Sequence, residues 1–265
     1  MLIESTAHLP ISLAMFDGVF NSPDGAALGR IILRWSHFVA GVTWIGLLYF
    51  FNLVNVPVQK LLDADTKKKV NPELLGRALW YFRWGAVVTV LAGLMYYAMY
   101  ILAVDVRNAN TLANANINVW FVLLAWLGYP VVLFLIEFVI IKKVPALIKD
   151  GRVFAIVMFI LVAIFTYGLV RYFGSVLTVG TESFASNKAY SIGIGGTYGI
   201  LMMLNVWGII WPANKRILAG LAGGPAAAPE LARQAFIASR TNAWLSLPML
   251  FFMGTSHGDW VIFGK

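Results

Sequence analysis

Six apolar blocks, each long enough to cross a lipid bilayer, constrain this sequence more than any other feature. A hydrocarbon layer about 30 Å thick takes about 20 helical residues, and a helix satisfies its own backbone hydrogen bonds inside lipid. Of the 265 residues, 60% are hydrophobic and 12% are charged, which is too few charges to cover a soluble domain. The sequence therefore predicts an all-α, polytopic transmembrane helical bundle with about six spanning helices. The predicted spans lie near residues 30–56, 78–104, 118–141, 153–173, 189–211 and 242–263.

The N-terminal segment is expected to differ from the rest of the chain. Its apolar stretch Leu9–Phe20 is too short to span a membrane and contains Pro10 and Asp17. No Lys or Arg precedes this stretch, which argues against a signal peptide. We expect a short interfacial segment over 1–29 and one transmembrane helical domain over 30–265.

Basic residues gather in alternate connections between the apolar blocks. Lys and Arg concentrate at 60–77, at 142–152 and after the fifth block, whereas the connections at 105–118 and 174–188 are nearly neutral. Basic loops of membrane proteins face the cytoplasm, so both termini are predicted on the periplasmic side of a bacterial inner membrane. The net charge of +8 comes from these loops and not from a basic groove lined by aromatic residues. The pattern predicts contact with the lipid bilayer and excludes nucleic acid as a partner.

Two of the three histidines lie inside predicted spans, His37 in the first and His257 in the last. His8 precedes the first span and is expected to be solvated or interfacial. Ionisable residues at membrane depth are uncommon and usually functional. His37 and His257 each lie about six residues, or roughly 9 Å at about 1.5 Å per residue, below the predicted outer end of a helix. The sequence therefore predicts two imidazoles at one depth, in the outer half of the membrane.

A pair of imidazoles from separate helices matches the axial ligation of a b-type haem, because haem iron takes nitrogen ligands and the macrocycle fits an apolar slot between helices. Gly41 near His37, and Gly254 and Gly258 near His257, would leave space for the flat ring. The absence of cysteine excludes covalent attachment of a c-type haem and excludes iron-sulfur clusters. His37 and His257 are therefore the predicted ligands of haem b. The alternative is that each imidazole hydrogen-bonds a neighbouring carbonyl group.

Four further charged residues lie near predicted helix ends. Arg34 and Arg171, at outer ends, are candidates for binding the haem propionates, because guanidinium and carboxylate groups pair well. Insertion of these arginines among lipid phosphates is the alternative. Arg83 and Glu137 lie near cytoplasmic ends, and an ion pair between them is expected to be structural.

The fifth block contains the sequence SIGIGGTYG, in which Gly195 and Gly199 are separated by one helical turn. This spacing is typical of helices that pack closely in membranes. A phosphate-binding loop is disfavoured, because no strand precedes the glycines and the spacing of a dinucleotide fingerprint is not met.

Three segments carry a resemblance to a known family: RWSHFVAGVTWIGLLYFFN in the first block, AYSIGIGGTYGILMMLNVWGIIWPANKRIL in the fifth, and RQAFIASRTNAWLSLPMLFFMGTSH near the end. They resemble the membrane-embedded N-terminal domain of the bacterial membrane-bound urate oxidase family. The resemblance implies a membrane domain that oxidises urate to 5-hydroxyisourate and passes electrons to a cytochrome c, which full-length members carry as a fused C-terminal domain. His37 and His257 match histidines of the family pattern.

Two departures from the family pattern leave two functions open. The family usually has a His after its Ala-Tyr pair, where this sequence reads Ser191, Ile192 and Gly193, and the sequence ends at Lys265 without the cytochrome c domain. One hypothesis is a haem-b-binding membrane redox protein that oxidises urate or a related substrate and passes electrons to a separate cytochrome c. The other is a non-catalytic accessory subunit of a larger respiratory or photosynthetic electron-transfer complex. A transporter is disfavoured, because few polar residues occupy mid-membrane positions.

Overall fold

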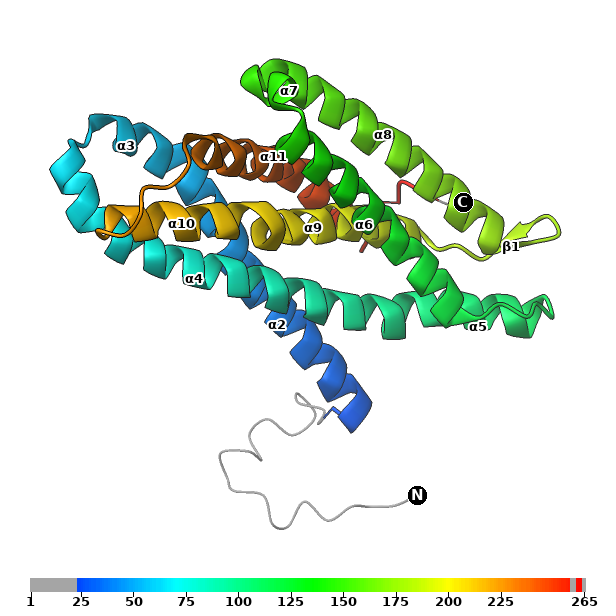
Figure 1. Cartoon of the computed structure of the whole chain (residues 1–265). Helices are drawn as coiled ribbons and strands as arrows, with labels where there is room; N and C mark the ends of the chain where they lie inside the picture. The colour runs from blue at the N-terminus through cyan, green and yellow to red at the C-terminus, as the bar shows by residue number, and fades with distance from the viewer. Residues whose placement is uncertain (1–22, 258–260, 264–265) are drawn as a thin grey trace, which may run out of the picture.

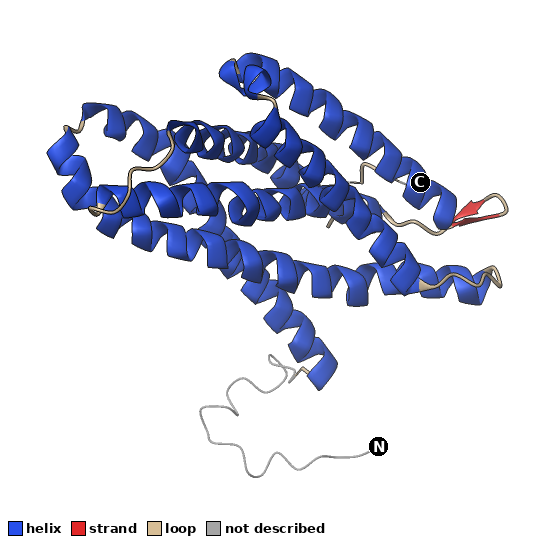
Figure 2. Ribbon diagram, viewed as in Figure 1, coloured by secondary structure: helices blue, strands red, loops and turns tan. Residues whose placement is uncertain are grey.

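The computed structural model describes residues 23–257 and 261–263, which fold almost entirely into helices (Figures 1 and 2). The predicted all-α bundle is confirmed. The first described helix begins at Gly25, so the interfacial segment predicted for 1–29 lies mostly outside the described residues. A short antiparallel hairpin, in which Thr178 lies opposite Ser183, is the one departure from helix and loop in this part of the chain.

The elements are labelled in chain order, and η denotes a π-helical segment. They are α2 (Gly25–Tyr49), η1 (Phe50–Asn55), α3 (Val56–Leu61), α4 (Ala64–Tyr97), η2 (Ala98–Leu102), α5 (Ala103–Leu112), α6 (Val119–Lys143), α7 (Pro145–Lys149), α8 (Gly151–Val176), β1 (Thr178–Val179), β2 (Glu182–Ser183), α9 (Asn187–Asn205), η3 (Val206–Ile210), α10 (Trp211–Leu221) and α11 (Pro229–Gly254). The π-helical segments join their flanking α-helices without a break, so three long rods result. Such segments are uncommon and often lie near functional sites.

Side chains that cap free backbone N–H groups explain where several helices begin. The Asp24 carboxylate accepts a hydrogen bond from Ala27 N at 2.7 Å, and the Asp63 carboxylate accepts from Asp65 N and Thr66 N, both at 2.9 Å. Ser186 Oγ accepts from Ala189 N at 3.1 Å. Asp and Ser are favoured at this position because the first N–H groups of a helix have no partner within the helix.

Five helical stretches of the described residues are long and apolar enough to cross a membrane, namely Gly25–Leu61, Ala64–Leu112, Val119–Lys143, Gly151–Val176 and Asn187–Leu221. They contain the first five predicted spans and fit a multi-pass membrane protein. The sixth predicted span, 242–263, was placed wrongly along the chain. The helix there, α11, begins at Pro229 and ends at Gly254, because its more polar first half packs inside the bundle as helix instead of forming a loop.

The buried centre of the bundle is α9, which packs against α4, α6 and α11 (Figure 1). A Cβ atom at Gly195 would lie 3.2 Å from the Met249 carbonyl oxygen of α11, and one at Gly199 would lie 3.5 Å from Met249 Sδ. Without side chains at these positions, the two helices approach closely. The close packing predicted from the glycine spacing is therefore confirmed.

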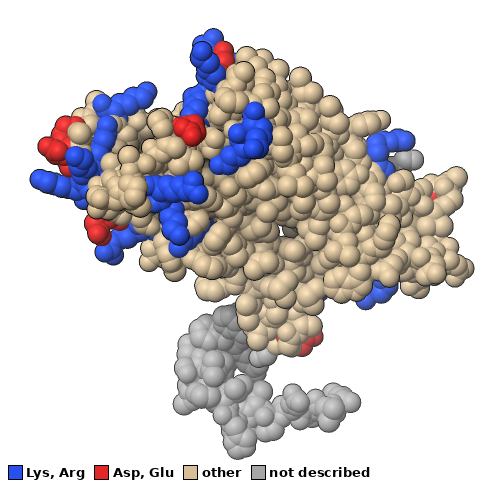
Figure 3. Space-filling view, in the orientation of Figure 1, with Lys and Arg blue, Asp and Glu red and all other residues tan. Residues whose placement is uncertain are grey.

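The outside of the bundle is apolar along its middle and basic at one end. Large hydrophobic side chains such as Trp35, Trp120 and Phe159 are mostly exposed. Figure 3 shows Lys and Arg gathered at the end of the molecule where α3, α7 and α10 lie, while the middle of the same face carries almost no charge. An apolar exterior of this kind fits lipid as the surrounding solvent.

Candidate functional site

The His37 imidazole is fixed against α4. Its Nδ1 lies 2.8 Å from the Thr89 carbonyl oxygen, and because a carbonyl can only accept, Nδ1 is the donor. The lone pair of the ring is then on Nε2. The hydrogen bond to the Thr89 carbonyl sets the tautomer and the direction in which Nε2 points, as in many metal-binding histidines.

Glycine on α4 makes room for this ring. A Cβ at Gly93 would lie 2.7 Å from His37 Nδ1, a distance that no side chain tolerates, so only glycine allows the imidazole to lie here. Gly41 was predicted to leave space for a macrocycle. It faces Thr89 instead, since a Cβ at Gly41 would lie 3.5 Å from Thr89 Cγ2. Gly41 therefore serves the packing of α2 on α4.

His257 lies in the turn that follows α11, three residues beyond Gly254, and not inside the last helix as predicted. Its Nδ1 lies 2.6 Å from Ser256 Oγ. Partial burial lowers the pKa of His257, and the positive charges of Arg34 and Lys188 lower it further. The ring is thus predominantly neutral near pH 7, which is the form that binds a metal ion.

The helix limits on which the prediction of equal depth for the two histidines rested are wrong. His37 is twelve residues after the start of α2, whereas His257 is beyond the end of α11. The hydropathy pattern placed both helix ends incorrectly. The two regions are linked instead through Arg34, which precedes His37 by one turn of α2 and acts electrostatically on His257.

The two predicted anion-binding arginines have different environments. The Arg34 guanidinium lies 5.9 Å from the centre of the Tyr96 ring of α4, and its charge reaches His257. Arg171 is exposed on α8 and has no hydrogen bond or ion pair with any residue that the structure describes. The structure therefore brings Arg34, but not Arg171, to the region of the histidines.

Packed aromatic residues occupy the region where the family pattern has a third histidine. Ser191 is fully buried and donates a hydrogen bond to Asn187 Oδ1 at 3.3 Å. A Cβ at Gly193 would lie 2.6 Å from Phe173 Cε2, and the Gly193 carbonyl oxygen accepts from Trp126 Nε1 at 3.0 Å. Side chains from α6 and α8 fill this space.

Asn187, at the start of α9, anchors the chain on both sides of His257. Its Nδ2 donates to the Thr255 carbonyl oxygen at 2.9 Å. Its Oδ1 accepts from the backbone N–H groups of Ile262 and Phe263, both at 3.1 Å. His257 is therefore held near the N-terminal end of α9 by contacts that sequence spacing does not reveal.

The expected ion pair between Arg83 and Glu137 does not form. The Arg83 guanidinium stacks on the Trp211 ring, 3.7 Å from its centre. Glu137 Oε2 accepts a hydrogen bond from Asn205 Nδ2 at 3.0 Å, and the same amide nitrogen donates to Asn242 Oδ1 at 3.0 Å. This buried cluster was not predicted from the sequence, although the presence of Glu and Asn inside three apolar blocks is the signal that could have revealed it.

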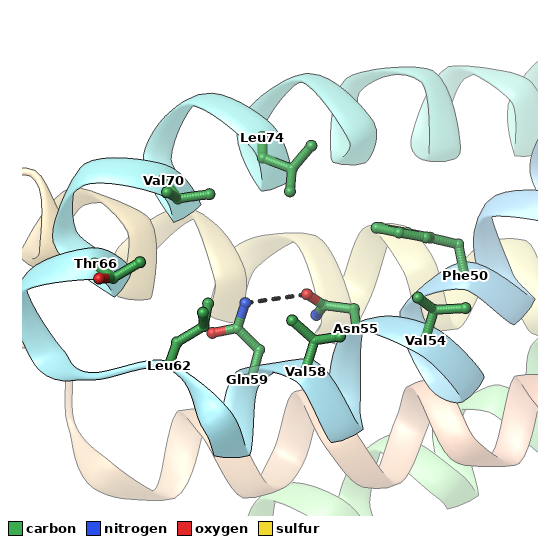
Figure 4. A pocket seen from close by; sticks show the side chains of 9 residues that line it. All are labelled: Phe50, Val54, Asn55, Val58, Gln59, Leu62, Thr66, Val70 and Leu74. Atoms are coloured by element: carbon green, nitrogen blue, oxygen red, sulfur yellow. Dashed lines mark hydrogen bonds between the residues drawn. The ribbon is translucent and has the colours of Figure 1, made fainter.

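A pocket near the basic end of the molecule is separate from both histidines. Apolar side chains of η1, α3 and α4 form most of its lining, and Figure 4 shows Gln59 Nε2 donating to Asn55 Oδ1, at 3.1 Å. Gln59 also exchanges two hydrogen bonds with Asn71 of α4, at 2.9 and 2.8 Å. The lining has no ionisable side chain, and the hydrogen bonds between Gln59 and Asn71 join α3 to α4 beside it.

Comparison with known proteins gives one finding. The profile of the family described as urate oxidase N-terminal matches residues 62–264, which are most of the chain and include His257. His37 and the rest of the first helix precede the matched residues. No curated protein and no solved structure matches. The chain belongs to the urate oxidase N-terminal family.

Proposed function

We propose that the chain is a haem-b-binding integral membrane redox protein that oxidises urate or a related substrate and passes electrons to a separate cytochrome c. Family membership supports the substrate class. The observation that carries the haem proposal is the His37 imidazole, held by the Thr89 carbonyl at 2.8 Å with its Nε2 lone pair left for a metal ion.

Three side chains at this end of the bundle support the proposed haem site. His37 and His257 would hold the haem through imidazole nitrogens, and Arg34 would pair with a propionate carboxylate. Arg34 and Lys188 make this end of the bundle locally positive, which suits propionates and anionic purines. The bound haem would supply one-electron transfer. Arg171 stays a sequence-based prediction.

The proposed reaction balances without molecular oxygen. Urate and one water molecule give 5-hydroxyisourate, two protons and two electrons, and cytochrome c takes up the electrons one at a time. We place the acceptor on the periplasmic side of a bacterial inner membrane, with both termini on that side. The basic end seen in Figure 3 supports this orientation, because it would face the cytoplasm.

A pyridine haemochrome assay and a reduced-minus-oxidised spectrum of the purified protein test the proposal. We expect a b-type α band in the wild type that is lost or shifted in His37→Ala and in His257→Ala. His8→Ala is the matched control, because it removes the third histidine of the sequence and should leave the band unchanged. A wild type without haem, or a band that neither substitution alters, would contradict the proposal.

The second candidate is an accessory membrane subunit of a larger electron-transfer complex. The packing of Phe173 against Gly193 favours it, since position 193, where the family's third histidine could lie, has no space for a side chain. Copurification with large cofactor-bearing subunits, together with no urate turnover when cytochrome c is added, would select this candidate over the first.

A further inference from the structure

Glu137 of α6 is a carboxyl group with no exposed surface, in the interior of a membrane bundle. Its one hydrogen-bond donor is Asn205 Nδ2 of α9, at 3.0 Å from Oε2. The second hydrogen of that amide goes to Asn242 of α11. Asn242 Nδ2 in turn donates to the Met202 carbonyl oxygen at 2.9 Å. Three helices thus contribute to one buried amide and carboxyl cluster.

Two oxygen atoms of this cluster have no hydrogen-bond partner. They are Glu137 Oε1 and Asn205 Oδ1, and both belong to fully buried side chains. Burial of a polar atom without a partner is costly, so such atoms call for an explanation. Both are acceptors when Glu137 is ionised, and neither can then satisfy the other.

No Lys or Arg of the described residues forms an ion pair with Glu137. In the described residues the single ion pair joins Arg77 to Glu73, far along the sequence from α6. Among the charged and titratable groups on α6 and its neighbours, Lys142 donates to Gln234, Tyr198 bonds to Thr166 and Arg240 stacks on Phe236, whereas Lys149, Arg152 and Tyr167 are exposed. Arg83 of α4 stacks on Trp211, and its Nε and Nη1 atoms are buried without a hydrogen-bond partner, but no ion pair joins it to Glu137 in the described residues. An ionised Glu137 would be a buried charge without a counterion.

One proton on Glu137 would give both unpartnered oxygens a hydrogen-bond partner. Asn205 Nδ2 already donates to Glu137 Oε2, so the amide and the carboxyl group are in direct contact. The two oxygens without partners, Glu137 Oε1 and Asn205 Oδ1, belong to these same two groups. A proton on Oε1 makes Glu137 a donor, for which Asn205 Oδ1 is an available acceptor. Carboxylic acid and amide then exchange two hydrogen bonds.

We propose that Glu137 is an intramembrane proton-binding site, a carboxylic acid that shares its proton with the side-chain amide of Asn205. The site is separate from the histidines and from the proposed haem. The π-helical segment η3 begins directly after Asn205, at Val206, so the helix is irregular beside the proton-binding pair. Five residues further along α6, Lys142 Nζ donates to Gln234 Oε1 of α11 at 2.7 Å.

Infrared spectroscopy of the protein in lipid tests whether the proton is present. At neutral pH we expect the carbonyl stretching band of a protonated carboxylic acid, a shift of that band in D₂O, and its loss in Glu137→Gln. Glu73→Gln is the control, because Glu73 is exposed and its removal should leave the band unchanged. Absence of the band in the wild type, or its persistence in Glu137→Gln, would overturn the proposal.

Substitution with an isostere gives a second test. Glutamine at position 137 can accept from Asn205 Nδ2 and donate to Asn205 Oδ1, as the protonated acid does. Glu137→Gln should therefore keep the Tm of the wild type at neutral pH and lose less stability than the wild type as the pH is raised. A strongly lowered Tm in Glu137→Gln at neutral pH would show that the native site needs the negative charge, and the proposal would be wrong.

A hydrophobic carbodiimide distinguishes a proton from a metal cation. This reagent attacks protonated carboxyl groups, so mass spectrometry should find an adduct on Glu137 at neutral pH and less of it at alkaline pH. Addition of NaCl at constant pH should not protect Glu137 when compared with choline chloride. Protection by sodium, or labelling that does not depend on pH, would contradict a site that binds only a proton.

Discussion

The helix α8 and the rod formed by α9, η3 and α10 show two opposite ways of building a membrane helix. The most apolar stretch of α8 has a mean hydropathy of 2.7 and only 17% of it is buried, whereas in the α9 rod the mean hydropathy is 1.4 and 67% is buried. The more apolar helix faces outward. In a bilayer, hydropathy therefore marks exposure to lipid, and moderate polarity marks the protein interior.

The second helix of the polar interior is α11. Its buried side chains include Gln234, Asn242 and Ser246, and they bond to α6, α9 and α2 respectively. Lipid cannot satisfy these groups, so they determine which helices must be neighbours. The apolar side chains on α8 need no hydrogen-bond partner, so they do not determine which helix lies next to α8. We therefore expect substitutions in α9 and α11 to affect stability far more than those on α8.

Asn205→Leu should have the largest effect. The substitution removes the donor to Glu137 and to Asn242, which leaves two buried oxygens without partners, and we expect a loss of about 3 kcal/mol in the free energy of unfolding. Unfolding in mixed micelles, followed by circular dichroism, measures this loss. A change as small as that of an outward-facing substitution on α8 would remove the distinction between the two regions.

Gly193→Ala should come next. Its Cβ would lie 2.6 Å from a ring carbon of the buried Phe173, so the ring must move, at a cost of about 2 kcal/mol. Gly128→Ala on α6 is the matched control, because a Cβ there meets no atom within 4 Å. The control should be neutral or stabilising, since alanine favours helix. Equal Tm values for the two variants would contradict the packing of α9.

The loop that joins α3 to α4 lies outside both regions, and its contribution should depend on pH. Hydrogen bonds from the Thr66 hydroxyl and from the Thr66 and Asp65 N–H groups hold the pKa of Asp63 below its ordinary value of 3.8. The ionised cap is therefore fully stabilising above that pH, and the stabilisation is lost as the pH falls through the folded pKa. Asp63→Ala should lower the Tm slightly at neutral pH, and the difference from wild type should shrink in acid.

Phe159→Leu on α8 should have the smallest effect. Phe159 is 75% exposed and faces outward, so the change in the free energy of unfolding should stay within about 0.5 kcal/mol. The same micelle titration measures it. A loss several times larger would mean that another protein surface covers α8 in the folded state, and α8 would then resemble the interior helices.

The sequence predicted part of the candidate site and missed the rest for identifiable reasons. His37 and Arg34 were singled out because ionisable residues in an apolar block are conspicuous, and their role in a site stays a prediction. The helix limits around His257 were wrong, since the polar half of α11 is stabilised by neighbours that no local pattern reveals. Glu137 was paired with Arg83 because their charges are opposite and both lie near predicted cytoplasmic helix ends, but Asn205 is the residue that donates a hydrogen bond to Glu137.

The sequence by itself determined that the chain is helical and belongs in lipid, because 60% hydrophobic residues arranged in long blocks leave no other stable arrangement. Only the tertiary structure decided which polar groups meet, such as His37 with Thr89 and Glu137 with Asn205. Hydropathy is a property of each segment alone. Hydrogen bonds between helices depend on the rotation and packing of segments that are far apart in the chain.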